Sequence, residues 1–242
     1  MKTLIVGGGL SGLALAASLE AAGHDYLLVE ARDRVGGRIK TERFDDGYFD
    51  LGPAWFWPGQ PRIAGLVDRL GLEKFTQYSA GDQVFEDTHG KVQRGRGFAS
   101  MEGSWRLKGG LGLLAQSLAG LLPDTRLRLN AGVIALAKTD AAITATLSDG
   151  TILQADRIVL ALPPRIAAQI EFSPALSPEA MKSMQGIPTW MAGQAKAIAV
   201  YNAPFWREAG LSGDATSRFG PMVEIHDASP ATGGPYGLFG FI

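Results

Sequence analysis

A glycine-rich turn near the N-terminus constrains the fold of this sequence more than any other feature. Residues 2–6 contain the short apolar run LIV, which stops at three glycines, and the alanine-rich stretch 13–22 follows. We therefore expect a strand, a tight turn and a helix. In that context the pattern G-x-G-x-x-G lets the backbone approach a pyrophosphate and directs a helix N-terminus towards it. The residues predicted to bind in this turn are Gly7, Gly9, Leu10, Ser11 and Gly12.

An acidic residue ends the next predicted strand. Residues 26–29 are mostly apolar, and Glu30 follows them, about 20 residues after the glycines. A carboxylate at this distance accepts hydrogen bonds from the ribose hydroxyls of a dinucleotide. The alternative is that the glycines only shape a structural corner, and Glu30 in register with them argues against it. The sequence therefore predicts a site for adenosine diphosphate, with a 2′-phosphate disfavoured.

The residues after Glu30 narrow the choice of cofactor. Residues 30–38 read EARDRVGGR, and Thr41 follows soon after. This run resembles the extended fingerprint of flavin-dependent amine oxidases, the family of monoamine, polyamine and L-amino-acid oxidases. The resemblance implies FAD, and two adjacent glycines followed by an arginine also suit a loop folded over a diphosphate. The cofactor-binding residues expected here are Glu30, Ala31, Arg32, Gly36, Gly37 and Arg38.

The same resemblance implies a fold and a division into domains. The expected class is α/β, with a Rossmann-like FAD-binding domain of the GR2 type and an interleaved, smaller α+β substrate domain. Residues 1–77 and 108–170 should form the FAD-binding domain, and residues 78–107 and 171–242 an incomplete substrate-side domain. The segment 155–164 contains the uninterrupted apolar run 158–162 and stops at a double proline, which predicts a fully buried, central parallel strand.

Two departures from the resembled family affect the predicted substrate domain. Monoamine oxidases carry a long helical insertion where residues 78–106 are short and rich in glycine and charge, so we expect a smaller entrance to the site. Relatives also carry a further C-terminal block that binds FAD. The sequence is therefore expected to be part of a longer protein or a truncated relative.

Two later segments resemble parts of the family that contact FAD. The segment 52–55 follows an aspartate, and the likeness implies that Gly52, Pro53, Ala54 and Trp55 line the isoalloxazine ring. Clustered aromatic residues in an ordinary core are the alternative. The likeness also implies that Val133 meets the adenine through its main chain, where the alternative is an ordinary strand valine.

A lysine near the C-terminal end is the predicted catalytic residue. The arrangement K-x-x-x-x-Y-x-x-P-F-W, which begins at Lys196, is similar to the family segment whose lysine is held through a water near flavin N5. On the expected strand Lys196 shares a face with Ile198 and Val200, unusual company for a solvated cation. The alternative is an edge-strand lysine that discourages aggregation.

Composition argues against several other classes of function. The net charge is −1 with both signs scattered, so no surface for nucleic acid is expected. The absence of cysteine excludes disulfides, thiolate catalysis and a cysteine-linked flavin within these residues. No apolar run approaches the ~18 residues of a membrane span, and we expect a soluble, cytoplasmic protein. His24, His89 and His226 are isolated in the sequence, so no metal site is expected.

The function implied by the resemblance is FAD-dependent oxidation of a carbon–nitrogen bond in a small-molecule amine. Hydride equivalents would pass to flavin N5, the imine would hydrolyse, and oxygen would reoxidise the flavin to give peroxide. One alternative is an FAD-dependent desaturase or protoporphyrinogen-oxidase-like enzyme. Another is a truncated, non-catalytic flavin-binding module. Lys196 followed by the P-F-W segment favours amines.

We predict that the flavin is bound non-covalently. The sequence has no cysteine, and its three histidines do not lie in a recognised attachment segment. Acid precipitation of the purified protein should therefore release all yellow colour into the supernatant. Colour that stays in the washed pellet would contradict this prediction.

Overall fold

The structure is a computed structural model that describes residues 2–97, 99–140 and 142–242. Two units, each built from two separate stretches of chain, make up the fold. Unit 1 comprises Met1–Arg38 and Ala115–Ala192, and unit 2 comprises Ile39–Leu114 and Gly193–Ile242. The assignment of cofactor and substrate roles to the two predicted domains stays a prediction. No helix in the described part of the chain is long and apolar enough to cross a membrane.

Unit 1 contains two four-stranded sheets and short helices. Its elements are β1 (Thr3–Val6), α1 (Leu10–Ala21), β2 (Tyr26–Val29), the 3-10 helix η1 (Asp124–Arg126), β9 (Leu127–Arg128), β10 (Val133–Lys138), β11 (Ile143–Leu147), β12 (Ile152–Ala155), β13 (Arg157–Leu160), α4 (Pro164–Ala167), β14 (Glu171–Ser173) and α5 (Pro178–Gly186). The helix α3 (Leu111–Ala119) begins in unit 2 and ends in unit 1.

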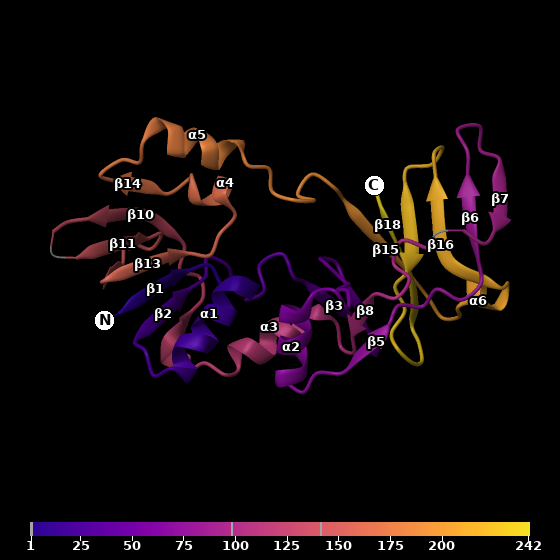
Figure 1. The fold of residues 1–242 in the computed structure, drawn as a ribbon, viewed down its shortest axis with the longest axis horizontal. Helices are drawn as coiled ribbons and strands as arrows, with labels where there is room; N and C mark the ends of the chain where they lie inside the picture. Colours follow the sequence, from indigo (N-terminus) through magenta and orange to yellow (C-terminus); the bar gives the residue numbers. More distant parts are fainter. Residues whose placement is uncertain (1, 98, 141) are drawn as a thin grey trace. The chain divides into compact units, whose positions relative to one another are not determined.

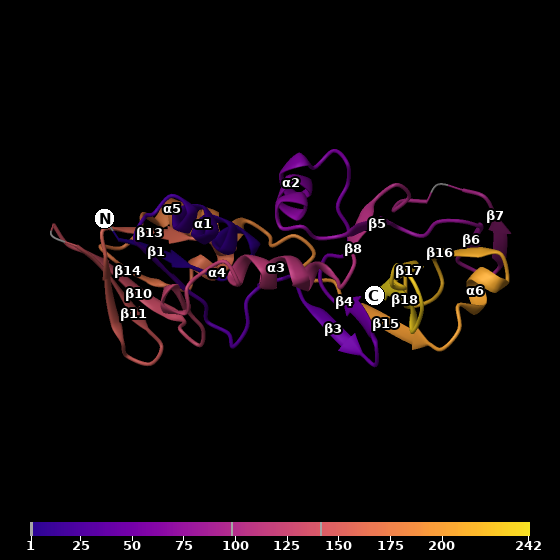
Figure 2. The same cartoon turned by 90° about the horizontal axis from the view of Figure 1, so that it is seen from below.

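The two sheets of unit 1 enclose its core. One sheet has the order β13-β1-β2-β9 with parallel pairs, and the other has the order β12-β11-β10-β14. Buried side chains from both sheets form one cluster, which includes Leu4, Val29, Leu136 and Leu147. Figure 2 shows α1 on the opposite side of β1 from β10 and β11. The first sheet is therefore covered on both faces, as parallel sheets generally are.

The turn between β1 and α1 has the form that the glycine pattern predicts. Gly7 has φ +110°, which is accessible to glycine and strained for other residues. A Cβ atom on Gly12 would lie 1.9 Å from the carbonyl oxygen of Gly7, so only glycine lets the helix start this close to the strand. The predicted strand, turn and helix are confirmed.

The segment 155–162, which contains the apolar run 158–162, occupies a different place from the one predicted. It forms β13, which is parallel as expected, but within the described residues it pairs with β1 alone and lies at the edge of its sheet. Its side chains are half-buried or exposed, and Ile158 and Leu160 pack against the core cluster from one face. The prediction of a fully buried central strand is wrong because an apolar run indicates a buried face, not two neighbouring strands.

Unit 2 is built mainly from strands. Its elements are β3 (Thr41–Phe44), β4 (Gly47–Asp50), α2 (Pro61–Arg69), β5 (Lys74–Thr76), β6 (Asp82–Glu86), β7 (Val92–Gly95), β8 (Trp105–Leu107), β15 (Lys196–Tyr201), α6 (Phe205–Glu208), β16 (Leu211–Ser217), β17 (Glu224–Asp227) and β18 (Tyr236–Phe241).

A six-stranded sheet with the order β15-β18-β17-β16-β6-β7 forms the larger part of unit 2 (Figure 1). The hairpin β3–β4 and the pair β5–β8 are separate two-stranded sheets. Phe49 of β4 and Phe239 of β18 are buried in one small cluster, against which Trp55 and Phe241 pack. The end of β4 is thereby placed beside the strand pair β15–β18.

Candidate functional site

The N-terminal end of α1 presents free backbone donors. The first bond of the helix runs from Leu13 N to Gly9 O at 2.9 Å, so the N–H groups of Leu10, Ser11 and Gly12 have no acceptor inside the helix. Gly9 is the N-cap, no side chain caps the helix, and its first turn has no acidic residue. This end of α1 therefore carries uncompensated positive dipole charge, which suits an anion such as a phosphate group.

A second glycine loop lies against the first. Gly36 N donates to Gly8 O at 2.8 Å, and a Cβ atom on Gly37 would stand 3.2 Å from the Cα atom of Gly9. The side chain of Arg32 donates to Gly37 O at 3.3 Å, so this arginine holds its own loop. Arg38 is exposed, and within the described residues its guanidinium has no hydrogen-bond partner. It is thus free to face an anionic ligand.

Glu30 connects these two loops. Its carboxylate is buried, and Oε2 accepts from Gly8 N at 2.7 Å while Oε1 accepts from Arg32 N at 3.0 Å. The spacing of Glu30 from the glycines predicted a ligand contact but gave no sign of this structural role. A carboxylate has about four acceptor positions, so two remain for hydroxyl groups of a ligand.

The start of β10 completes this group of residues in unit 1. Ala131 N donates to Glu30 O at 2.8 Å, and Asn130 N donates to Arg32 O at 2.9 Å. Residues 130–132 therefore run beside residues 30–32, and Val133 comes next. Amide donors, a buried carboxylate and an unpaired arginine are the groups that an adenosine diphosphate moiety requires. The role of each predicted residue, including Ala31 and Val133, stays a prediction.

In unit 2, carbonyl oxygens and aromatic rings surround the ammonium group of Lys196. Its Nζ atom donates to Gly52 O at 2.7 Å and to Asp50 O at 3.2 Å. The same atom lies 4.4 Å from the ring centre of Phe239 and 5.4 Å from that of Trp55, at cation–π distance. Desolvation by burial lowers the pKa of Lys196 to about 8, although the charge of Asp50 opposes this shift. Lys196 therefore has a larger neutral fraction at neutral pH than an exposed lysine.

The predicted ring-lining segment lies next to this lysine. Gly52 contacts it directly, Ala54 is buried, and Pro53 is exposed. The indole nitrogen of Trp55 donates to Gln77 Oε1 at 2.8 Å, which orients the ring. The structure thus brings Gly52 and Trp55 together with Lys196 within unit 2.

His226 belongs to a buried network, contrary to the expectation that the three histidines are isolated. Its Nδ1 atom is 2.5 Å from Asp214 Oδ1, and its Nε2 atom is 2.8 Å from Glu224 Oε1. Burial opposes the charged ring, but its hydrogen bonds to the two carboxylates outweigh this effect and raise the pKa of His226. Its ring also meets that of Trp55 edge to face at 5.6 Å. Glu224 is only two residues from His226, but Asp214 lies on the neighbouring strand β16, so sequence spacing alone could not reveal the whole network. Among the described residues, no group of three or more His, Asp and Glu side chains could hold a metal ion.

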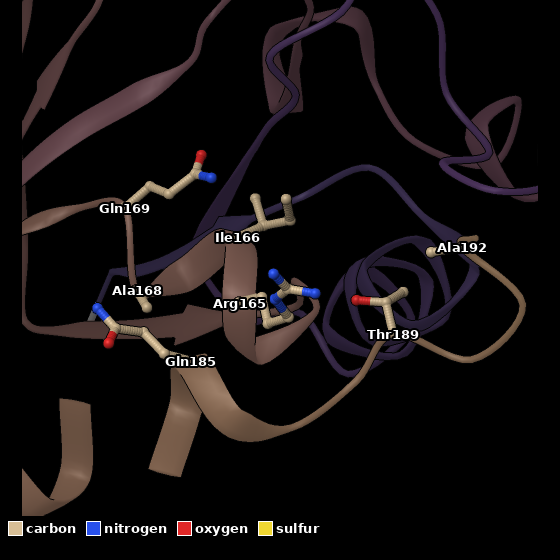
Figure 3. Close-up of a pocket in the computed structure, with 7 residues that line it drawn as sticks. All are labelled: Arg165, Ile166, Ala168, Gln169, Gln185, Thr189 and Ala192. Atoms are coloured by element: carbon tan, nitrogen blue, oxygen red, sulfur yellow. The ribbon is translucent and has the colours of Figure 1, made fainter. Parts of the chain in front are cut away.

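A surface pocket of about 550 Å³ lies elsewhere in unit 1 (Figure 3). Residues of α4, of α5 and of the segments that follow each helix line it, and none of the predicted site residues is among them. The lining residues are Arg165, Ile166, Ala168, Gln169, Gln185, Thr189 and Ala192.

The chain matches one family model over nearly its whole length. The model is described as flavin containing amine oxidoreductase, and it matches residues 10–97 and 80–237. The two matches overlap at residues 80–97, which include β6 and β7. They lie within residues 78–106, where the sequence is expected to depart from monoamine oxidases.

Two curated relatives show the extent of the similarity. A Dictyostelium discoideum protein named as a probable flavin-containing monoamine oxidase A is 24% identical over 337 positions, which cover 99% of this chain and 74% of the relative. Against 242 residues here, roughly a hundred of those positions face gaps in this chain. The putrescine oxidase of Kocuria rosea is 42% identical over 82 residues, which cover 34% of this chain and 17% of that protein.

Solved structures share the fold. A putrescine oxidase bound to putrescine has a TM-score of 0.88 and 22% identity, and the match covers 100% of this chain and 76% of that one. Cyclohexylamine oxidase from Brevibacterium oxydans has a TM-score of 0.88 and 20% identity, with 100% and 75% covered. These structures are mixed assemblies of helices and sheets with an FAD-binding fold, and at this TM-score the present chain has that fold too.

We predict that the charge of Glu30 is needed for tight binding of FAD. In Glu30→Gln one oxygen remains to accept from a loop amide, but the charge-assisted hydrogen bonds to the ribose are weakened. Each such bond contributes about 1.5–3 kcal/mol, so the affinity should fall tenfold or more. A fluorescence titration of apoprotein with FAD measures the effect, and Glu171→Gln, at an exposed position of β14, is the control. Equal affinities of Glu30→Gln and wild type would refute the assignment.

Proposed function

Because the chain belongs to the flavin-containing amine oxidoreductases, we propose that it oxidises the carbon–nitrogen bond of a small amine. Membership of this family makes it an FAD-dependent oxidoreductase. Bound FAD would accept the hydride equivalent from the amine and pass the electrons to oxygen, with peroxide as the product. The observation that supports amine oxidation most directly is the placement of Lys196 against Gly52 and Trp55.

The residues of unit 1 would bind the adenosine diphosphate half of FAD. The free amides at the start of α1 would receive the diphosphate, assisted by Arg38, and Glu30 would accept from the ribose hydroxyls. The segment 52–55 and Lys196 would lie at the flavin ring, and Val133 at the adenine. The groups present in unit 1 fit these roles. The amides of α1 and the guanidinium of Arg38 suit an anionic diphosphate, and the carboxylate of Glu30 suits the ribose hydroxyls.

Lys196 would act on the step in which oxygen takes up electrons. Its ammonium group is held by two carbonyl oxygens and aromatic faces, so it can present a fixed positive charge where negative charge develops on oxygen. Its lowered pKa also allows it to give up a proton near neutral pH more readily than an exposed lysine. Contact with the amine itself is not required for either role.

Two names among the similar proteins suggest which amines to test. Putrescine oxidase and cyclohexylamine oxidase act on one aliphatic diamine and one cyclic amine, as their names state. Both compounds belong in a substrate panel for this protein.

The proposed function predicts a yellow protein that amines bleach. The purified protein should show a flavin spectrum, and an amine from the panel should remove the absorbance under anaerobic conditions. Readmission of oxygen should restore it with formation of peroxide. A flavin that no amine reduces would favour the desaturase or protoporphyrinogen-oxidase-like alternative. A protein that binds no FAD would favour a non-catalytic module.

We predict that Lys196→Met slows reoxidation while leaving flavin binding and anaerobic reduction largely intact. Loss of the charge near the reducing oxygen should lower the oxidative rate at least about tenfold, which is ~1.4 kcal/mol of barrier. Stopped-flow measurement of the two half-reactions separates these effects, and Lys91→Met at an exposed lysine outside the proposed site is the control. An oxidative half-reaction at the wild-type rate would make Lys196 an ordinary strand residue.

A further inference from the structure

The carbonyl groups that hold Lys196 belong to the end of β4 and the turn after it. Lys196 Nζ donates to the main-chain oxygens of Asp50 and Gly52. The side chain of the same Asp50 is engaged elsewhere, at the start of α3. The position of the lysine therefore depends on whatever fixes Asp50.

Asp50 is anchored on the first turn of a helix that is distant in sequence. Its carboxylate is buried and accepts from Leu111 N, at 3.0 Å to Oδ1 and 3.2 Å to Oδ2. The hydroxyl of Thr41 also donates to Oδ1, and its oxygen accepts from Gly112 N at 2.8 Å. The first turn of α3 has no acidic residue of its own. Asp50 and Thr41 together therefore supply the cap and the negative charge for this helix.

The close packing at this cap explains why glycines occupy positions 110 and 112, which are not part of the proposed cofactor site. A Cβ atom on Gly110 would lie 2.9 Å from Asp50 Oδ1 and 2.5 Å from a methyl carbon of Thr41. A Cβ atom on Gly112 would lie 2.7 Å from the Thr41 hydroxyl oxygen. Glycines at both positions let α3 approach the end of β4 closely. The Asp50 carboxylate can then accept from Leu111 N and from the Thr41 hydroxyl at the same time.

The charge of Asp50 also bears on Lys196. Desolvation lowers the pKa of Lys196, the ionised Asp50 opposes this shift, and Arg106 of β8 adds to it. Desolvation in turn raises the pKa of Asp50, against the hydrogen bond from Thr41. The titratable side chains of His226 and Glu224 lie on β17, one strand further along the sheet than β18, where these residues pair with Phe239 and Phe241.

We propose that Asp50 is a positioning residue for Lys196. Its carboxylate, anchored on α3 and Thr41, holds its own carbonyl and that of Gly52 where they receive the lysine, and it supplies negative charge to this partly buried cation. The importance of this contact between Asp50 and Lys196 for catalysis rests on the proposed function. The contact itself is seen in the structure and does not depend on that function.

The test measures the protonation of Lys196 directly in the purified protein with its bound flavin. Competitive acetylation with acetic anhydride across a pH series, read by peptide mass spectrometry, gives the apparent pKa of each lysine. Asp50→Asn keeps an oxygen that can accept from Leu111 N but removes the charge. The apparent pKa of Lys196 should fall by about one unit in this variant, because an opposing charge has been lost. Asp50→Ser, a second neutral capping residue, serves if the first variant does not fold.

Thr41→Val is the matched control, since it removes a partner of the same cap but leaves the charge of Asp50 in place. It should lower the stability of the protein and shift the Lys196 pKa much less than Asp50→Asn does. Equal pKa values of Lys196 in wild type and Asp50→Asn would overturn the proposal and leave Asp50 as a helix cap only. So would equal shifts in Asp50→Asn and Thr41→Val.

Kinetics of the holoenzyme then separate this inference from the proposed function. If the protein oxidises amines, the pH profile of reoxidation in Asp50→Asn should move to lower pH in step with the labelling result. A labelling shift without any amine oxidation would reject the proposed function and keep the Asp50–Lys196 relation. Amine oxidation with no labelling shift would reject the relation alone.

Discussion

The approach of one glycine backbone to another is the constraint on which unit 1 depends. The carbonyl of Gly7 faces Gly12 at a distance that excludes any side chain, and a Cβ atom on Gly37 would make a tight contact, 3.2 Å, with the Cα atom of Gly9. This packing leaves the first amides of α1 open, and it places Glu30 where both loops can donate to it. The same interactions that shape the turn therefore create the anion site and orient the carboxylate beside it.

In unit 2 the central constraint is electrostatic: the charge of the partly buried Lys196 must be stabilised. A lysine ammonium is costly to bury, and here it is compensated by two carbonyl oxygens, the faces of aromatic rings and the charge of Asp50. Asp50 is in turn stabilised by a helix start that lacks an acid of its own. Asp50 thus caps α3 and also favours the charged form of Lys196. A substitution at Asp50 should therefore affect both the helix and the lysine.

Local patterns predicted the parts of the structure whose geometry is local. The glycine turn and the strand that Glu30 follows depend on neighbours in sequence. Properties set by distant residues were missed or wrong. The edge position of β13 depends on how the strands are ordered around β1. The His226 network joins side chains of two strands. The cap on α3 comes from a hairpin about sixty residues earlier in the sequence. The prediction of FAD came from the family resemblance. A sequence motif specifies residues that contact a particular ligand, whereas the overall composition does not.

The interleaving of the two units has a consequence for how the chain acquires its structure. In unit 1 the first strand pairs with β13, which joins Thr3 to Arg157. In unit 2, β6 pairs with β16, which joins Asp82 to Leu211. Pairings between such distant residues make chain closure slow, because the entropy of a long loop must be lost before contacts repay it. During synthesis β1 cannot pair with β13 until Arg157 has emerged, and by then the first stretch of unit 2 has already been made.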